Sequence, residues 1–364
     1  MGQTFVRMIA VAIALSEWMI GDVLAGQNGR MVYTMSNATS GNAVLAFEQR
    51  GETLIPAGSF PTQGAGSGDG LGNQGAIAIS DDGETLFAVN AGSDEVSVFQ
   101  IHDHGLTLTC KVSSGGVRPI SIALHEDWVY VLNAGGPGNI TGFTLTSRNT
   151  LEPIPGSTQS LSGPATAPAQ IEFNPEGNTL VVTEKATQII NTYTVDDDGV
   201  AVGPASQPSS GVTPFGFSFN KRGVLIVSEA FGGAPNASAV SSYTLKNGEL
   251  SLRSGSVPDF QSAACWIVIT KNGKFAYTSN TGSNTVSSYR VGRAGSLTLL
   301  ASEAGRTGAT PIDMALNRNS KFLYVLNATA RTIDVFRVNR GSGELTLLTG
   351  ISGLPAGVNG LVAQ

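Results

Sequence analysis

A short apolar run that ends in a polar side chain recurs seven times along the chain. The runs are rich in Val, Leu, Tyr and Thr, residue types that favour β-strands. Successive runs end 43 to 53 residues apart, which is the period of four-stranded propeller blades rather than of helical repeats. The pattern therefore predicts an all-β, seven-bladed β-propeller. The runs span residues 32–37, 86–90, 129–133, 180–184, 225–229, 276–280 and 323–327.

Each repeat also contains the turns that a four-stranded blade needs. In the second copy, apolar or alternating segments are separated by short turns rich in Gly, Asp and Ser, and the other copies follow the same plan. No amphipathic helix is predicted within the repeats. The predicted strands of the second copy are residues 75–80, 86–90, 95–101 and 106–112.

The two ends of the chain complement one another. The first repeat lacks an opening strand, because Gly29 and Arg30 lead directly into the second-strand motif, whereas residues 357–363 have the form of an opening strand with nothing after it. We therefore expect the C-terminal strand to complete blade 1 and close the ring, which leaves only short, protected sheet edges. Residues 26–364 then form one propeller domain, which we expect to be a monomer.

Residues 1–25 do not share the repeat. Arg7 precedes an apolar stretch at residues 8–15, and small residues at 23–25 precede Gly26. This order is typical of a secretory signal peptide. Because the apolar run is too short to span a bilayer, the sequence predicts export to the periplasm or the exterior, with a mature chain that starts near Gly26.

Charge and cysteine content limit the partners. A net charge of −6 and a pI of about 5.1 leave no basic surface for nucleic acid or for an acidic membrane, so the expected partner is a small, neutral molecule. Cys110 and Cys265 fall in different predicted blades, beyond disulfide reach, and both are expected to be free. No cysteine spacing typical of a metal or redox site occurs; we expect neither a metal nor a cofactor.

The candidate site lies where the polar ends of the second strands meet the openings of the innermost strands. Since these strands run antiparallel, both sets of ends gather at one mouth of the central channel. Five copies end the second strand in Asn, including Asn133, whereas two neighbouring copies end it in Glu184 and Glu229. The carboxylates could act as an acid-base pair or bind a cation. Alternatively, each accepts backbone hydrogen bonds at its own turn, as the Asn side chains do, and Lys185 could neutralise either one.

Trp266 and Asp313 also differ in type from the residues at equivalent positions of the other copies. Trp266 could stack on a ring-shaped ligand or pack between blades. Asp313 could be a third carboxylate at the mouth, or it could pair with Arg118 or Arg331. Both residues are therefore candidates for ligand contact and for a purely structural role.

Other segments point away from familiar catalytic centres. The three histidines are expected away from the mouth, which argues against a Ser-His-Asp site and against a histidine-ligated zinc or copper centre. Residues 196–199 read DDDG but lack the spacing of a calcium loop, so a hairpin turn is expected. Residues 64–75 form a glycine-rich connection into blade 2 and could cover the channel, as could residues 159–169. The histidines are His102, His104 and His125.

Three of the runs, at residues 129–133, 276–280 and 323–327, read VYVLN, AYTSN and LYVLN and resemble the YVTN-type repeat. With the seven predicted blades, residues 30–364 are similar to the seven-bladed lactonase family, which includes 6-phosphogluconolactonases and carboxymuconate cyclases. The run LVVTE at residues 180–184 is similar to that family's strand ending in an active-site glutamate. The resemblance implies a lactonase-type hydrolase in which Glu184 serves catalysis.

Several family positions differ in this chain. Ala169 and Gln170 stand where the family has an Arg-His pair after the inner-strand proline of blade 4. Ile120 stands where a histidine is usual in blade 3, and Thr281 replaces an arginine in blade 6. Those cations would stabilise a carboxylate and a developing oxyanion. Hydrolysis of a phosphorylated sugar lactone is therefore not expected.

Two hypotheses follow. In the first, the chain is an exported lactonase-like enzyme that acts on a small neutral lactone, with Glu184 or Glu229 as the base that activates water. In the second, it is a non-catalytic propeller of the cell envelope or exterior that binds a ligand or a protein on the same face. Under the first hypothesis the substrate contacts would come from the donors Gln170 and Asn133, the stacking wall Trp266, and Asp313 and Arg118.

Overall fold

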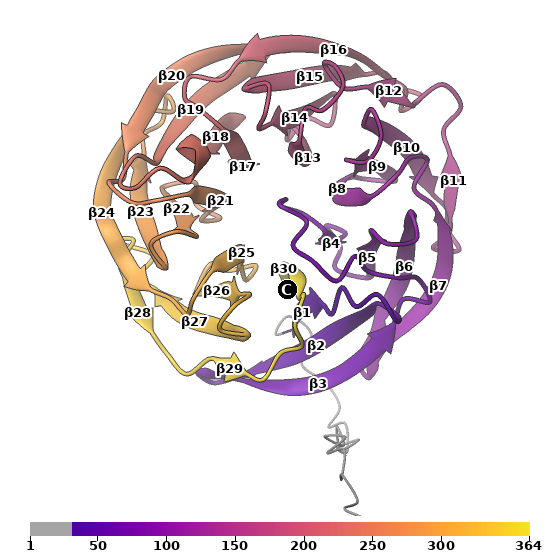
Figure 1. Cartoon of the computed structure of the whole chain (residues 1–364), viewed down its shortest axis with the longest axis horizontal. Helices are drawn as coiled ribbons and strands as arrows, with labels where there is room; N and C mark the ends of the chain where they lie inside the picture. The colour runs from indigo at the N-terminus through magenta and orange to yellow at the C-terminus, as the bar shows by residue number, and fades with distance from the viewer. Residues whose placement is uncertain (1–30) are drawn as a thin grey trace, which may run out of the picture.

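The computed structural model describes residues 31–364, so the predicted signal peptide at residues 1–25 lies outside the described residues. Seven β-sheets stand around a central axis, and the chain passes through them in order (Figure 1). The predicted all-β, seven-bladed propeller is confirmed. A 3-10 turn at Phe231–Gly233 is the one helical element among residues 31–364. Nothing in this part of the chain forms a helix with the length and apolar character needed to cross a membrane.

Within a blade, successive strands run from the channel outward, and each pairs antiparallel with the next. Blade 1 departs from this order because its innermost strand comes from the C-terminus. In blade 3 the outer edge is divided between two short strands. Blade 1 contains β30 (Asn359–Ala363), β1 (Met31–Met35), β2 (Ala43–Arg50) and β3 (Thr53–Pro61); blade 2 contains β4 (Ile77–Ile79), β5 (Thr85–Asn90), β6 (Glu95–His102) and β7 (Gly105–Ser113); blade 3 contains β8 (Pro119–His125), β9 (Trp128–Asn133), β10 (Asn139–Leu145), β11 (Leu151–Pro153) and β12 (Gln159–Ser160).

The remaining four blades repeat the plan, and blade 7 again divides its outer edge between two strands. Blade 4 contains β13 (Pro168–Phe173), β14 (Thr179–Glu184), β15 (Ile189–Val195) and β16 (Ala201–Pro208); blade 5 contains β17 (Pro214–Phe219), β18 (Val224–Glu229), β19 (Ala239–Lys246) and β20 (Glu249–Pro258); blade 6 contains β21 (Ala264–Ile269), β22 (Phe275–Asn280), β23 (Thr285–Val291) and β24 (Leu297–Arg306); blade 7 contains β25 (Pro311–Leu316), β26 (Phe322–Asn327), β27 (Thr332–Val338), β28 (Leu345–Leu347) and β29 (Ile351–Ser352).

The hydrophobic core lies between the blades. All residues of the second strands β14 and β18 are buried, since neighbouring blades pack on both of their faces. Most residues of the outer strand β16 are exposed or partly exposed, as expected for a strand that meets water. Large aromatic side chains such as Tyr130 and Tyr277 are fully buried between blades.

The C-terminal strand closes the ring, as predicted. β30 pairs antiparallel with β1, which aligns Leu361 with Thr34 and Ala363 with Val32. The Thr34 hydroxyl donates a hydrogen bond of 2.5 Å to the Gly360 carbonyl. Two segments from opposite ends of the chain thus share one sheet (Figure 1).

Other local predictions can be compared with the structure directly. The opening strand of blade 2 is shorter than predicted, Ile77–Ile79, because the Gly75 carbonyl accepts a hydrogen bond from Ile122 N of blade 3 at 2.9 Å. Asp196 accepts hydrogen bonds from the amides of Asp198 and Val200 at 3.1 and 2.8 Å, which confirms the hairpin turn. Both cysteines are free.

Candidate functional site at the channel mouth

The polar ends of the second strands meet the openings of the inner strands, as expected. Pro119 pairs with Asn133, Pro168 with Glu184, and Pro214 with Glu229. The pairing register shifts immediately afterwards in blades 3 to 7. Such β-bulges re-aim the side chains that follow them, so the direction of each candidate residue has to be taken from its contacts.

Glu184 is fully buried and directs its carboxylate into its own blade. Oε1 accepts hydrogen bonds from Ser162 N at 2.9 Å and from the Asn191 side chain at 2.5 Å. Oε2 accepts from the hydroxyls of Ser162 and Thr187, the latter at 2.6 Å. The carboxylate therefore joins the connection after β12, the turn after β14 and strand β15.

Glu229 has equivalent surroundings in blade 5. It is fully buried, and its oxygens accept hydrogen bonds from the hydroxyls of Ser241 in β19 and Ser256 in β20, the latter at 2.7 Å. Burial raises the pKa of Glu229, while these hydrogen bonds partly oppose the shift. The two carboxylates thus share no partner: the side chains that donate to Glu229 lie in blade 5, whereas the donors to Glu184 lie in blade 4 and in the connection that enters it from β12.

The Asn residues at the same strand ends make matching contacts. Asn90 and Asn280 each donate a 2.8 Å hydrogen bond to the serine seven positions later, in the third strand of the same blade. The Asn133 amide donates to Ser114 O at 3.1 Å and to the Asn139 side chain at 2.8 Å. The Asn and Glu side chains at the ends of the second strands therefore bond to residues of the adjacent turns and third strands.

Gln170 and Asp313 connect neighbouring blades. Gln170 Oε1 accepts from Phe217 N at 2.7 Å, and its Nε2 donates to Phe217 O at 2.9 Å. Asp313 accepts from Met314 N at 2.8 Å and from Leu361 N in β30 at 3.0 Å. Burial raises the pKa of Asp313 well above its usual range. Asp313 is thus bonded to backbone amides, whereas Arg331 donates to the Leu354 carbonyl.

A segment at residues 70–75, which we refer to as the plug, occupies the channel mouth. The Gln74 side chain both donates to and accepts from the backbone of Ile267 in blade 6, at 2.8 and 3.1 Å. Its amide donates to Ala169 O of blade 4 at 3.0 Å, and the Asn73 side chain donates to Ile120 O of blade 3. A segment bonded to inner strands of blades 3, 4 and 6 must lie near the axis, where Figure 1 shows the chain before β4 reaching inward.

The residues around the mouth hold the plug in place. The indole N–H of Trp266 donates to Asn73 O at 2.7 Å, and only 4% of the side chain is exposed. The exposed Arg118 donates to Gly70 O at 3.4 Å. Gly216 leaves room for Gln74, because a Cβ at this position would lie 2.2 Å from Gln74 Oε1. Residues 70–75 of the glycine-rich connection thus lie at the channel, whereas residues 64–68 bond to blade 1 and to the turn after β5.

Lys185 also lies at the mouth, but it forms no ion pair with Glu184 or Glu229 in the described residues, so the expectation that it neutralises one of them was wrong. Its ammonium donates to Gly72 O of the plug and, at 2.9 Å, to Pro168 O, and it lies 4.6 Å from the centre of the Phe215 ring. Burial, with a smaller contribution from Arg118, lowers the pKa of Lys185 to about 8. In the sequence, Lys185 stands out only because it directly follows Glu184. Nothing in the sequence indicates that it bonds to Gly72 of the plug.

Four carboxyl groups predict an unusual dependence of stability on pH; Glu229, Asp259 and Asp313 are buried, and Glu172 is partly exposed. Burial raises the pKa of Glu172 to about 8 and also raises those of Glu229, Asp259 and Asp313. Because folding raises these pKa values, the folded state binds more protons than the unfolded state between the two sets of values, and stability falls as pH rises. For Glu172 the window extends from 4.5 to about 8. We expect the melting temperature to decrease from about pH 5 to about pH 8.

Scanning calorimetry across this range is the measurement. The carboxylates of Asp82 and Glu95 have lowered pKa values, so their titration lies below the window. The melting temperature of a Glu172→Gln variant should decrease less steeply with pH, because this variant lacks the carboxyl group whose pKa is raised to about 8 in the folded protein. A melting temperature that rises steadily from pH 5 to pH 8 would contradict the assignment.

No three His, Cys, Asp or Glu side chains within residues 31–364 form a group that could hold a metal ion. Of the candidate residues at the mouth, Lys185, Arg118 and Trp266 donate hydrogen bonds to the plug. Together the closed mouth and the seven blades define a propeller whose channel is occupied by its own chain.

The chain belongs to the family described as Lactonase, 7-bladed beta-propeller, which matches residues 23–143 and 238–358. The resemblance based on the YVTN-type runs is thereby confirmed. No curated protein sequence matches the chain.

Solved structures show the same fold at low sequence identity. A putative 6-phosphogluconolactonase from Bacteroides fragilis NCTC 9343 is 18% identical, with a TM-score of 0.73 over 92% of this chain and 98% of that chain. A protein from Lactobacillus plantarum is 20% identical, with a TM-score of 0.73 over 92% and 98%. The periplasmic gluconolactonase of Pseudomonas aeruginosa is 16% identical, with a TM-score of 0.69 over 91% and 99%.

Proposed function

We propose that this protein is a non-catalytic member of the lactonase propeller family that binds a small molecule outside the cytoplasm. The observation that carries the proposal is the plug at the channel mouth. Gln74 and Asn73 use their side chains on the backbone of blades 6 and 3, and Lys185 and Trp266 bond to plug carbonyls. A lactone could not reach the inner strands without displacing these contacts.

The candidate bases support the same conclusion. A general base must lie within hydrogen-bond reach of the water that it activates. Glu184 already accepts four hydrogen bonds, two from its own blade and two from Ser162 in the connection before it, and both oxygens of Glu229 accept hydroxyl hydrogen bonds. The oxyanion formed during hydrolysis would also need free donors, yet the amide of Gln170 is bonded to Phe217 and Glu172.

Export and a monomeric state form part of the proposal. The charge order and small residues of positions 1–25 support export, and the Pseudomonas aeruginosa neighbour is a periplasmic protein. Closure of the ring by β30 supports a monomer, because it protects the sheet edges nearest the chain ends.

Lactone hydrolysis after withdrawal of the plug is the second candidate. Family membership favours it, and so does Glu229, whose raised pKa moves toward the range of an effective base at neutral pH. Under this candidate, a variant with a loosened plug would gain turnover that the wild type lacks.

Proton release by the purified protein, mixed with neutral and phosphorylated sugar lactones, tests the proposal. We expect no saturable turnover above the rate of the lactone alone. Glu184→Gln should instead lower the free energy of unfolding by about 2–3 kcal/mol, because an amide NH₂ would face donors that now bond to a carboxylate oxygen.

Urea unfolding measures that loss, and Glu176→Gln is the matched control. Glu176 is exposed in the same blade, so its replacement should change stability by less than about 0.5 kcal/mol. Saturable turnover that disappears in Glu184→Gln, with stability unchanged, would establish catalysis and overturn the proposal.

A further inference from the structure

On the face opposite the channel mouth, a tyrosine hydroxyl joins two neighbouring blades at two of the boundaries between blades. We call such a boundary a seam. Tyr130 and Tyr277 are the third residues of β9 and β22, and their hydroxyls donate to the carbonyls of Gly199 and Gly343 in the outer hairpin of the next blade, at 2.6 and 2.9 Å. The hairpin glycines also pack closely, since a Cβ on Gly343 would lie 2.6 Å from the Phe275 ring.

The seam between blade 7 and blade 1 also has a tyrosine in the second strand and a glycine in the facing hairpin, but no hydrogen bond joins them. Tyr324 is the third residue of β26, yet its hydroxyl has no hydrogen-bond partner among residues 31–364. The carbonyl of the hairpin glycine, Gly51, instead accepts from Gln49 Nε2 at 2.9 Å. A Cβ added to Gly51 would meet nothing within 4 Å. The space beside the hairpin glycine, which side chains fill at the other two seams, is therefore empty at this seam.

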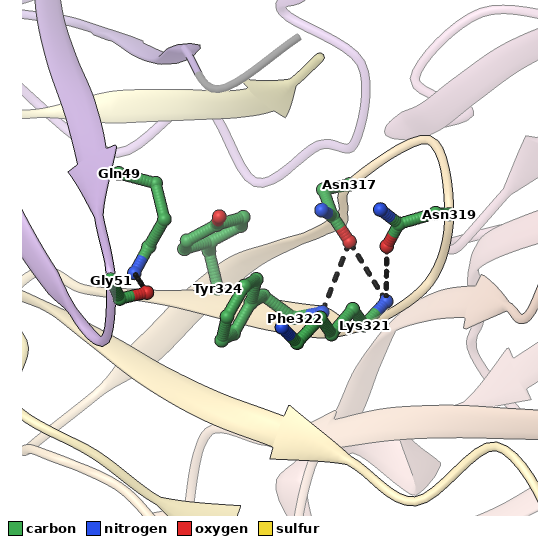
Figure 2. A pocket seen from close by; sticks show the side chains of 7 residues that line it. All are labelled: Gln49, Gly51, Asn317, Asn319, Lys321, Phe322 and Tyr324. Carbon is green, nitrogen blue, oxygen red and sulfur yellow. Dashed lines mark hydrogen bonds between the residues drawn. The ribbon is translucent and has the colours of Figure 1, made fainter.

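The open position is a cavity of about 200 Å³, shown in Figure 2. Gln49 reaches it from β2, and Phe322 and Tyr324 reach it from β26. By the volume that water takes in the liquid, the space holds about six water molecules, which is close to the size of one sugar ring. The lining residues are Gln49, Gly51, Asn317, Asn319, Lys321, Phe322 and Tyr324.

Some polar atoms of this cavity have no hydrogen-bond partner among residues 31–364. Gln49 is only 3% exposed, and its Oε1 has no hydrogen-bond partner. A buried acceptor of this kind is rare and calls for a partner. Asn317 and Asn319 use their side-chain oxygens to accept from Lys321 N at 2.9 Å, so each amide NH₂ remains as a donor. The Tyr324 hydroxyl can donate or accept.

We propose that this seam cavity binds a small, uncharged polyhydroxylated molecule of the size of a monosaccharide. Hydroxyl groups match the mixture of one buried acceptor, two amide donors and a phenol hydroxyl, and the apolar face of a sugar ring fits against the Tyr324 ring. The Lys321 ammonium lies over the Phe322 ring, 5.3 Å from its centre. The absence of Asp and Glu from the lining disfavours a metal ion. This inference rests on the proposed binding function, and it locates the binding site in the seam cavity, away from the plug.

Binding at this seam should also stabilise the closed ring, since the ligand would bridge β26 of blade 7 and β2 of blade 1. A ligand that binds the folded state alone raises the melting temperature with its concentration. The experiment is calorimetric titration of the full-length protein with D-glucose, D-galactose and myo-inositol, combined with melting curves. We expect saturable binding of at least one of them and a concentration-dependent rise in melting temperature.

Tyr324→Phe removes one hydroxyl that has no internal partner. It should weaken binding by at least about fivefold and leave the melting temperature of the free protein unchanged. Tyr277→Phe is the matched control: it should lower the melting temperature, because its hydroxyl is bonded to Gly343, and leave binding unchanged. Gln49→Met, which removes the unpartnered acceptor, should weaken binding independently.

Two results would overturn the seam site. One is the absence of saturable binding for all three probes, and the other is binding that survives in both Tyr324→Phe and Gln49→Met. Proton release from δ-gluconolactone on the same preparations separates this inference from the proposed function. Turnover would overturn the non-catalytic function without affecting the seam site, whereas failed sugar binding would overturn the seam site alone.

Discussion

We expect removal of residues 357–364 to abolish cooperative unfolding of the propeller. The deletion takes away Val358, which is 1% exposed, and β30, whose Leu361 is 6% exposed, and it leaves the inner edge of β1 unpaired. Burial of each side chain contributes about 1.5–3 kcal/mol, and the unpaired strand loses several hydrogen bonds of about 1 kcal/mol each. The sum approaches the whole stability of a typical domain, about 5–15 kcal/mol.

Circular dichroism during heating, with light scattering to detect aggregation, measures the effect. The exposed edge of β1 should also promote aggregation. Leu361→Ala provides a graded comparison: it keeps the backbone pairing, and should fold with a loss of about 2–4 kcal/mol. A truncated protein with the melting curve of the full-length chain would refute closure of the ring by β30.

Gln74→Ala should lower the free energy of unfolding by about 2–4 kcal/mol and loosen the plug. The substitution leaves Ile267 N and Ile267 O, which now bond to the Gln74 side chain, without partners beside the channel. Buried backbone groups without partners are strongly disfavoured. Urea unfolding measures the loss of stability.

Gln159→Ala is the control for the Gln74 variant. The Gln159 side chain donates to Gly156 O at 3.2 Å in an exposed part of blade 3, so its removal should have an effect of less than about 0.5 kcal/mol. Equal stability of the Gln74 variant and the wild type would show that Gln74 does not hold the plug across the channel.

The fold could be predicted from the sequence because its determinants are local and repeated. The spacing of runs ending at Asn90, Asn133 and Glu184 specifies the blade, and the incomplete repeats at the two ends specify closure. Strand burial also follows from the local pattern, since the second strands are apolar throughout. Each of these features depends on residues close together in the chain.

The contacts of the candidate site could not be predicted in the same way. Gln74 bonds to Ile267 and Trp266 bonds to Asn73, in both cases across 193 positions of sequence. Glu184 accepts from Ser162, which lies in a connection with no repeat equivalent. These contacts depend on how the irregular connections pack against the blades. The repeat pattern does not predict that packing.

One local signal for the structural role of the strand ends was present in the sequence. Asn90, Glu184 and Asn280 are each followed, seven positions later, by a Ser or Asn to which they bond. The position that faces each strand end in the third strand lies five residues later, so the residue seven positions later points to the same side of the sheet as that facing position. This shared spacing favours a contact within the blade over a site shared between blades.

Hydrogen exchange of the wild-type protein, resolved to the Gln74 amide, tests most directly whether the plug closes the channel. That amide donates to Ala169 O at the mouth, so we predict that it exchanges as slowly as the amides of the inner strands and opens only in global unfolding. Fast exchange at Gln74, with the inner strands still protected, would show that the plug leaves the channel in the native state and would contradict the closed mouth on which the non-catalytic function rests.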